Sequence, residues 1–304
     1  MSLIYKNNAH KSVREIIYYY KIFIILAICS QHIFPEESSC SPAKDTKRVV
    51  IAGGSITEIF YLLGIDDRIV ALDITSNYPE EAKELPSVGY VRMLSAEGLL
   101  SMNPTIILGE NDMGPPTVIQ QVRETGVELR IIPEEKSAQG IIEKIRCVAE
   151  TMGVSSLAEE LINHEFTEKY TAIKQNQDKI LKENISAMVI YSMQGTSPIV
   201  CGTGESGDAF LKLIGAENAF SGFEGWKPAS AESILANDPD YIIVTSRLLK
   251  RFSSIEELRN HPSLSQTTAA QNDNIIAKDG MAMMGFGPRT IDCALEVSKI
   301  ISSK

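Results

Sequence analysis

The stretch SSLAEELINHEFTEKYTAIKQNQDKILKE, residues 155–183, decides the fold of this chain. It contains neither glycine nor proline, the residues that most often interrupt a helix, so it predicts one continuous helix. At a rise of 1.5 Å per residue such a helix is roughly 40 Å long, which exceeds an ordinary crossover between two strands. We therefore expect residues 154–184 to form a rod that joins two lobes.

Strand patterns alternate with helix patterns on both sides of this rod. The strand runs before it are RVVIAGGS, RIVALD, PTIILG and VELRII, and those after it are SAMVIYS, PIVC, DYIIVTS and NIIAK. Such alternation predicts parallel sheets covered by helices. The expected fold class is α/β, with lobes at residues 48–153 and 185–304. In the first lobe, SITEIFYLLG predicts a helix with Ser55 as N-cap, Glu58 completing a capping box and Gly64 as its end.

An internal repeat supports this division into two lobes. SAEGLLSMNPTIIL, residues 95–108, matches SAESILANDPDYII, residues 230–243, at a constant offset of 135, with six of fourteen positions identical. Each copy reads as a capped helix, a breaker and a buried strand. Convergence on a common helix–strand pattern is the alternative, but duplicated lobes explain the constant offset better. The cleft between two such lobes is a natural ligand site.

The N-terminus differs from the rest of the chain. Residues 1–30 combine a basic start with the short apolar run IFIILAIC, which is typical of a secretory signal, and residues 31–47 read as a polar tether. An uncleaved anchor is the alternative. LAIC also faintly resembles a lipoprotein box, although Ile28 is the wrong size before Cys29. We expect a secreted protein, and the net charge of −10 argues against a nucleic-acid partner.

The five cysteines and four histidines do not indicate a metal site. No CxxC pair is present, and Cys147, Cys201 and Cys293 lie in apolar patterns that predict buried thiols and no disulfide framework. The histidines are scattered along the chain, so no cluster predicts a first-row metal centre.

The run VGYVRMLSAEG contains the strongest candidate for ligand chemistry. Tyr90 and Arg92 are two positions apart, so in an extended segment their side chains point the same way. A guanidinium beside a phenol favours the phenolate, a hard anionic oxygen that suits ferric iron, including haem iron. A plain Tyr–Arg stack at the surface is the alternative from the residues alone.

Residues 52–108 resemble the N-terminal lobe of haem-binding periplasmic proteins of ABC importers, the HmuT-like family, most specifically in GYVRMLSAEG. IVCGTGESGDAFLKLIGAENAF and GFGPRT resemble its C-terminal lobe, so the similarity runs from about Arg48 to the end. The resemblance implies two Rossmann-like lobes bridged by a long backbone helix, the class III architecture. It also implies a monomeric, non-enzymatic receptor that delivers haem b to a membrane permease and its ATPase, with Tyr90 as axial iron ligand and Arg92 beside it.

Four further residues follow from the resemblance. Met193 stands where some members carry a histidine ligand, and we expect it to form an apolar wall in preference to ligating iron. Arg289 could pair with a haem propionate or with a nearby carboxylate. Glu97 and Glu232, related by the repeat, are expected either to dock onto permease arginines or to stabilise their helix dipoles, two compatible roles.

Three other functions stay open from the residues. The same architecture could hold a siderophore or cobalamin. Gly202, Gly204 and Gly207 have the GxGxxG spacing of a dinucleotide site and raise a remote NAD-dependent enzyme, although no acidic residue clearly ends a second strand about twenty positions on. An adhesion or scaffold lipoprotein is the third.

Overall fold

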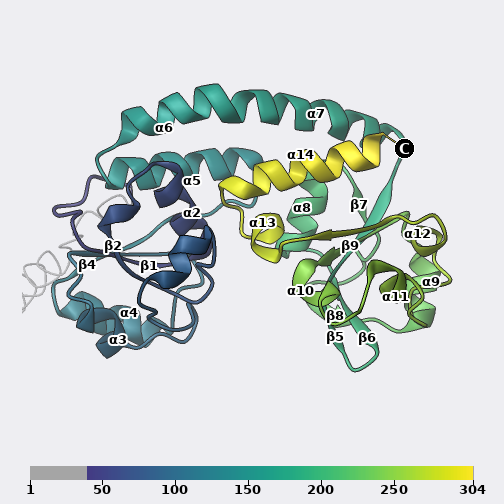
Figure 1. Cartoon of the computed structure of the whole chain (residues 1–304), viewed down its shortest axis with the longest axis horizontal. Helices are drawn as coiled ribbons and strands as arrows, with labels where there is room; N and C mark the ends of the chain where they lie inside the picture. Colours follow the sequence, from purple (N-terminus) through teal and green to yellow (C-terminus); the bar gives the residue numbers. More distant parts are fainter. Residues whose placement is uncertain (1–39, 304) are drawn as a thin grey trace, which may run out of the picture. The chain divides into compact units, whose positions relative to one another are not determined.

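The structure, a computed structural model, describes residues 40–303 (Figure 1). The predicted signal, residues 1–30, and the tether up to residue 39 lie outside the described residues. No helix in residues 40–303 is long and apolar enough to cross a membrane.

The N-terminal lobe is built on four parallel strands in the order β2-β1-β3-β4. The strands are β1 (Val49–Ala52), β2 (Ile69–Leu72), β3 (Ile106–Gly109) and β4 (Glu128–Ile131). Both faces of this sheet are covered, which explains the almost continuous apolar runs of its strands. Helices α2 (Gly54–Leu62) and α5 (Ala138–Thr151) pack on one face, and α3 (Ala96–Ser101) and α4 (Pro116–Glu124) on the other.

The long helix predicted from the glycine- and proline-free stretch is confirmed. It consists of α6 (Ser155–Leu161), a π-helical turn at Ile162–Phe166 and α7 (Thr167–Lys182), with no break in the helical path. The last helix, α14 (Pro288–Ser302), lies beside α7, and Lys169 forms an ion pair with Asp292 between them (Figure 1). Buried side chains of both helices belong to a core that also contains residues of both sheets.

The C-terminal lobe contains the sheet β10-β9-β5-β6-β8, with β7 paired to β5 off this path. The strands are β5 (Ser186–Gln194), β6 (Ser197–Cys201), β7 (Glu217–Asn218), β8 (Trp226–Pro228), β9 (Tyr241–Thr245) and β10 (Ile275–Lys278). The predicted parallel sheet is mixed, because β6 runs antiparallel to β5 and β8 antiparallel to β6. Gly195, at φ 60°, lies in the tight turn between β5 and β6, and such a turn returns the chain antiparallel.

Short helices complete this lobe. They are α8 (Ser206–Ile214), α9 (Ala231–Asn237), α10 (Ser246–Leu249), α11 (Ile255–Arg259), α12 (Thr268–Gln271) and α13 (Gly280–Met284). The N-terminal lobe has two 3-10 turns, η1 (Asp66–Arg68) and η2 (Glu80–Glu84).

The two repeat copies have the same local structure. The Ser95 hydroxyl caps α3 by accepting from the Gly98 amide at 3.0 Å, and Ser230 caps α9 by accepting from Ser233 at 3.2 Å. Each helix is followed by a residue with positive φ, Asn103 in the first copy and its equivalent in the second, then by proline and a buried strand. The structure therefore repeats itself where the sequence does.

Two local predictions were wrong. Gly53, with φ 156°, is the N-cap of α2, and Ser55 lies inside the first turn, where its hydroxyl bonds to Glu110 instead. Cys147 is not a thiol, because it forms a disulfide with Cys40 across 107 residues. The pairing joins the segment before β1 to α5, a contact that no local pattern reveals.

Candidate functional site

Tyr90 lies at the carboxyl edge of the N-terminal sheet. The chain after β2 turns back and runs beside it, so that the Val88 amide donates to the Leu72 carbonyl at 2.8 Å and the Ile74 amide to the Gly89 carbonyl at 2.9 Å. Gly89 has φ 96°, a conformation that favours glycine, and it ends this extra edge immediately before Tyr90. In open α/β sheets, ligands bind outside the carboxyl ends of the strands.

Arg92 links Tyr90 to a carboxylate. Its Nη1 donates to the Tyr90 hydroxyl at 3.3 Å, and its Nε donates to Asp112 Oδ2 at 2.8 Å. The side chains of Arg92 and Asp112 are 61% and 39% exposed, so the pair lies at the surface and not in the core. The hydrogen bond that Arg92 donates to Asp112 raises the pKa of Arg92 above its ordinary value, so the guanidinium stays charged.

The backbone fixes the loop that carries Asp112 against the Tyr90 segment. The Gly114 amide donates to the Val91 carbonyl, and the Leu94 amide donates to the Gly114 carbonyl, both at 2.9 Å. Asp112 is twenty positions from Arg92, and it was not identified from the sequence as a site residue. The one sequence feature that pointed to it is its position just after the buried strand β3.

Exposed apolar side chains flank Tyr90. Ile74 is 61% exposed and Met93 is 78% exposed, although both belong to ordinarily buried residue types. The Ile74 amide donates a hydrogen bond to the carbonyl of Gly89, the residue before Tyr90. The Met93 amide donates to the Tyr90 carbonyl at 2.8 Å. The surface around Tyr90 thus combines one phenol, one fixed cation and apolar area.

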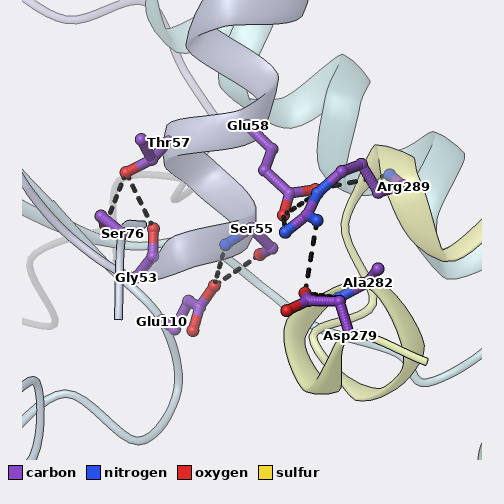
Figure 2. A network of polar contacts seen from close by, with 9 residues as sticks. All are labelled: Gly53, Ser55, Thr57, Glu58, Ser76, Glu110, Asp279, Ala282 and Arg289. Carbon is purple, nitrogen blue, oxygen red and sulfur yellow. Dashed lines mark hydrogen bonds and ion pairs between the residues drawn. The ribbon is translucent and has the colours of Figure 1, made fainter. Parts of the chain in front are cut away.

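Arg289 lies in a buried ion pair with a residue of the other lobe (Figure 2). Its Nε donates to Glu58 Oε1 at 2.9 Å, and its Nη1 is 3.3 Å from Asp279 Oδ1. Its guanidinium carbon also lies 3.9 Å from the centre of the Tyr78 ring. Burial raises the pKa of Glu58, whose side chain is 5% exposed. From the sequence, Arg289 had two possible partners, a haem propionate or a nearby carboxylate. In the structure Arg289 pairs with carboxylates.

A second polar network lies at the amino end of α2 (Figure 2). The Ser55 amide donates to Glu110 Oε1 at 3.0 Å. Lys144, 1% exposed, donates to the Ser55 hydroxyl at 2.9 Å and to Glu134 at 2.7 Å. Burial raises the pKa of Glu110 to about 7. A Cβ on Gly53 would lie 2.4 Å from the Glu110 side chain, so only glycine fits there.

Met193 does not have the exposed position expected of a cleft wall. It is 9% exposed and packs in the C-terminal core with Ile190 and Val200. The strand register shifts between Ile190 and Ser192, so Tyr191 is an extra residue with a side chain 48% exposed. On this part of the strand, Tyr191 therefore reaches the surface and Met193 does not.

The glycine-rich turn is filled by the protein itself. A Cβ on Gly202 would lie 2.3 Å from the Phe223 carbonyl oxygen, and the Gly204 amide donates to Asp208 Oδ2 at 3.2 Å. The preceding strand, β6, is antiparallel to its neighbours, whereas a dinucleotide fingerprint follows a parallel strand. The GxGxxG spacing is therefore present without the parallel strand that a dinucleotide site requires.

Glu97 and Glu232 are both exposed in the first turns of their helices, α3 and α9. The Ser230 hydroxyl lowers the pKa of Glu232. Among residues 40–303, no group of three or more His, Cys, Asp or Glu side chains is placed to hold a metal ion.

Two curated relatives are transport proteins. The chain is 24% identical over 270 residues to the uncharacterized ABC transporter substrate-binding lipoprotein YvrC of Bacillus subtilis, covering 85% of this chain and 81% of the relative. It is 24% identical over 200 residues to the vitamin B12-binding protein of Pectobacterium atrosepticum, covering 65% and 71%. Among solved structures, the periplasmic heme-binding protein BhuT in complex with two hemes matches with a TM-score of 0.75 and 29% identity, covering 85% of this chain and 99% of that one.

The family model described as "Periplasmic binding protein" matches residues 49–280, which spans both lobes and the helix between them. This match confirms the class III fold, the periplasmic location and the absence of an enzymatic role that the sequence predicts. The chain belongs to the periplasmic binding protein family and is the substrate-binding protein of an ABC transporter.

Proposed function

We propose that this protein is the haem receptor of its ABC importer, with the Tyr90 phenolate as the ligand of the ferric iron. The observation that carries the proposal is the contact of Arg92 with both the Tyr90 hydroxyl and the Asp112 carboxylate. A cation held beside a phenol stabilises the anionic oxygen, and phenolate is an established type of haem ligand.

The surroundings of Tyr90 suit a flat ligand with a large apolar face. Ile74 and Met93 expose apolar area beside the phenol, where a porphyrin could cover it. Haem is here the cargo, so the site needs one oxygen ligand and a surface for the macrocycle and no closed metal centre. The likeness to a solved haem-bound relative supports the same ligand class.

Delivery requires a permease and its ATPase, and we propose that Glu97 and Glu232 contact the permease. Both are exposed, each lies in the first turn of a capped helix, and the two helices are copies of one repeat. Two equivalent carboxylates, one per lobe, would match a two-fold symmetric partner.

A haemin titration followed by absorption spectroscopy tests the ligand. Wild type should bind haemin saturably, with a phenolate-to-iron charge-transfer band, and Tyr90→Phe should lose this band and bind at least about tenfold more weakly. Tyr170→Phe on the linking helix removes a hydroxyl far from this loop in sequence and should change neither. Tight binding with an unchanged spectrum in Tyr90→Phe would remove Tyr90 as the ligand.

Cobalamin is the second candidate, because the chain is 24% identical to a vitamin B12-binding protein over 65% of its length. The same titration with cyanocobalamin separates the two ligands. Binding of cyanocobalamin without binding of haemin would overturn the haem proposal. A ferric siderophore in a third titration tests the remaining ligand class of this architecture.

A further inference from the structure

Tyr191 occupies an exceptional position in the C-terminal lobe. It is the bulged residue of β5, and its carbonyl accepts a hydrogen bond from the Thr245 hydroxyl at 3.1 Å. Thr245 is the last residue of β9, which runs parallel to β5, so Tyr191 lies at the carboxyl edge of the parallel strands. Tyr90 lies at the corresponding edge of the other sheet.

The Tyr191 ring is packed against the single tryptophan of the chain. The ring centres of Tyr191 and Trp226 are 5.5 Å apart, with the planes at 52°. The Trp226 indole donates to Glu205 Oε2 at 3.1 Å, and a Cβ on Gly207 would lie 3.2 Å from the indole ring. The tryptophan is therefore fixed from two sides, and it holds a tyrosine ring that stays half exposed.

A series of contacts connects this ring to the N-terminal lobe. A Cβ on Gly280 would lie 3.5 Å from Thr245, the partner of Tyr191. The next residue, Met281, lies over Gly54 of the N-terminal lobe, where a Cβ would meet its methyl carbon at 2.6 Å.

From Gly54 the path continues to the loop that holds the other tyrosine. The Thr75 carbonyl oxygen would lie 2.9 Å from a Cβ on Gly54. The preceding residue, Ile74, is hydrogen-bonded to Gly89, which adjoins Tyr90. The contact between Gly54 and Met281 thus joins the segment that leads to Tyr90 with the segment that contacts Thr245, the partner of Tyr191.

The geometry points to Tyr191, backed by Trp226, as an aromatic wall that stacks on the face of a flat macrocycle opposite Tyr90. This inference rests on the proposed function and extends it to the recognition of the porphyrin ring. Stacking is favoured over a second iron ligand because, within residues 40–303, no side chain hydrogen-bonds or ion-pairs with the Tyr191 hydroxyl, whereas the Tyr90 hydroxyl contacts Arg92. An aromatic face also attracts a flat conjugated ring in offset stacking.

Metal-free protoporphyrin IX separates stacking from ligation, because it offers the ring without the iron. Tyr191→Leu should weaken haemin and metal-free protoporphyrin IX by the same factor, about 5-fold or more, whereas Tyr191→Phe should bind both as wild type does. Tyr90→Phe should weaken haemin and leave the metal-free ring almost unchanged. Quenching of Trp226 fluorescence reports binding of either compound, and the circular dichroism spectrum checks the fold of each variant.

The outcomes distinguish the two proposals. Equal affinity of Tyr191→Leu and wild type for metal-free protoporphyrin IX would overturn the aromatic wall while leaving haem binding intact. Loss of haemin binding in Tyr191→Phe with the metal-free ring retained would make Tyr191 a ligand and overturn stacking. Failure of the wild-type chain to bind haemin would instead overturn the proposed function.

Discussion

The guanidinium of Arg92 bridges a carboxylate and a phenol, with Nε 2.8 Å from Asp112 Oδ2 and Nη1 3.3 Å from the Tyr90 hydroxyl. Asp112 therefore acts on the proposed ligand through Arg92 and not by direct contact. A hydrogen-bonded partner restricts the rotamers of a long side chain, so Asp112 orients the cation that faces Tyr90.

Replacing Asp112 with asparagine should release Arg92 and weaken haemin binding by a factor of about 2 to 5. The effect is small because both partners are more than one-third exposed, and exposed ion pairs contribute only about 0.2–1 kcal/mol. Titration at low and high salt provides the measurement, and high salt should narrow the difference. Glu124→Gln, an exposed carboxylate of the same lobe, is the matched control; an equal loss in both variants would argue against a role in orienting Arg92.

The buried pair of Arg289 and Glu58 should be structural. Arg289→Met leaves Glu58 as a buried carboxylate without its main partner and should lower the free energy of unfolding by about 3–5 kcal/mol. The double variant Glu58→Gln/Arg289→Met should lose less unfolding free energy than the sum of the two single variants, because it leaves no buried charge without a partner. Urea denaturation measures both. Additive losses would contradict coupling, and a stable Arg289→Met that selectively loses haemin would favour the propionate partner.

The two free cysteines should be inert in the folded protein. Cys201 and Cys293 are buried, which raises the pKa of each thiol to about 12, so almost no thiolate exists near neutral pH. Iodoacetamide followed by peptide mapping should label neither residue in the native protein and both after denaturation. The same map without reductant should recover Cys40 and Cys147 as one linked peptide. Rapid native labelling of Cys201 would show that its pocket opens.

The disulfide should also stabilise the fold. Cys40→Ala with Cys147→Ala removes a link that closes a loop of about one hundred residues, and losses of roughly 2–5 kcal/mol are typical of native disulfides. In thermal unfolding, adding reductant should lower the stability of wild type by about as much as the double substitution does. Reductant should leave the stability of the double variant unchanged. A reductant effect that persists in the double variant would have another origin.

The sequence predicted correctly those parts of the fold that depend on residues close together in the chain. The repeat copies were recognised because serine caps, prolines and apolar strands are short-range features, and the linking helix because nothing in it breaks a helix. The hairpin at Gly195 was missed because a single glycine followed by threonine is a weak turn signal. The disulfide was missed because its partners are distant along the chain.

The candidate site divides in the same way. Tyr90 and Arg92 are near neighbours, so their contact could be predicted, whereas Asp112 joins them through a loop that only the folded sheet brings close. The resemblance predicted Met193 as an apolar wall of the cleft, whereas the structure places a bulge at Tyr191, leaves Tyr191 half exposed and packs Met193 in the core. Bulges leave no clear signal in a single sequence.

The raised pKa of Glu110 predicts a pH dependence of stability. Because about 7 lies above the ordinary value of 4.5, the folded state binds this proton more tightly than the unfolded chain does. The resulting stabilisation is fully present below pH 4.5 and is lost as the pH rises through 7. Glu110→Gln keeps the acceptor for Ser55 but cannot titrate, so it should lack this component.

Urea denaturation between pH 4.5 and 8 measures that component. Relative to Glu110→Gln, wild type should lose about 1–3 kcal/mol of unfolding free energy over this range, less than the full value per pKa unit because Glu110 is partly exposed. Glu58, whose pKa is also raised, is present in both proteins and cancels in the comparison. Parallel stability curves for the two proteins would show that Glu110 does not titrate in this range.

The proposed contact with the permease can be separated from ligand binding. Glu97→Lys and Glu232→Lys reverse two exposed charges, so together they should reduce uptake through the reconstituted transporter by tenfold or more while haemin affinity stays unchanged. Each variant also places a cation at a helix N-terminus, where it opposes the helix dipole, so the free energy of unfolding should fall only slightly. Glu160→Lys on the linking helix is the control for added charge. Normal uptake by the double variant would leave these glutamates only their role at the helix ends.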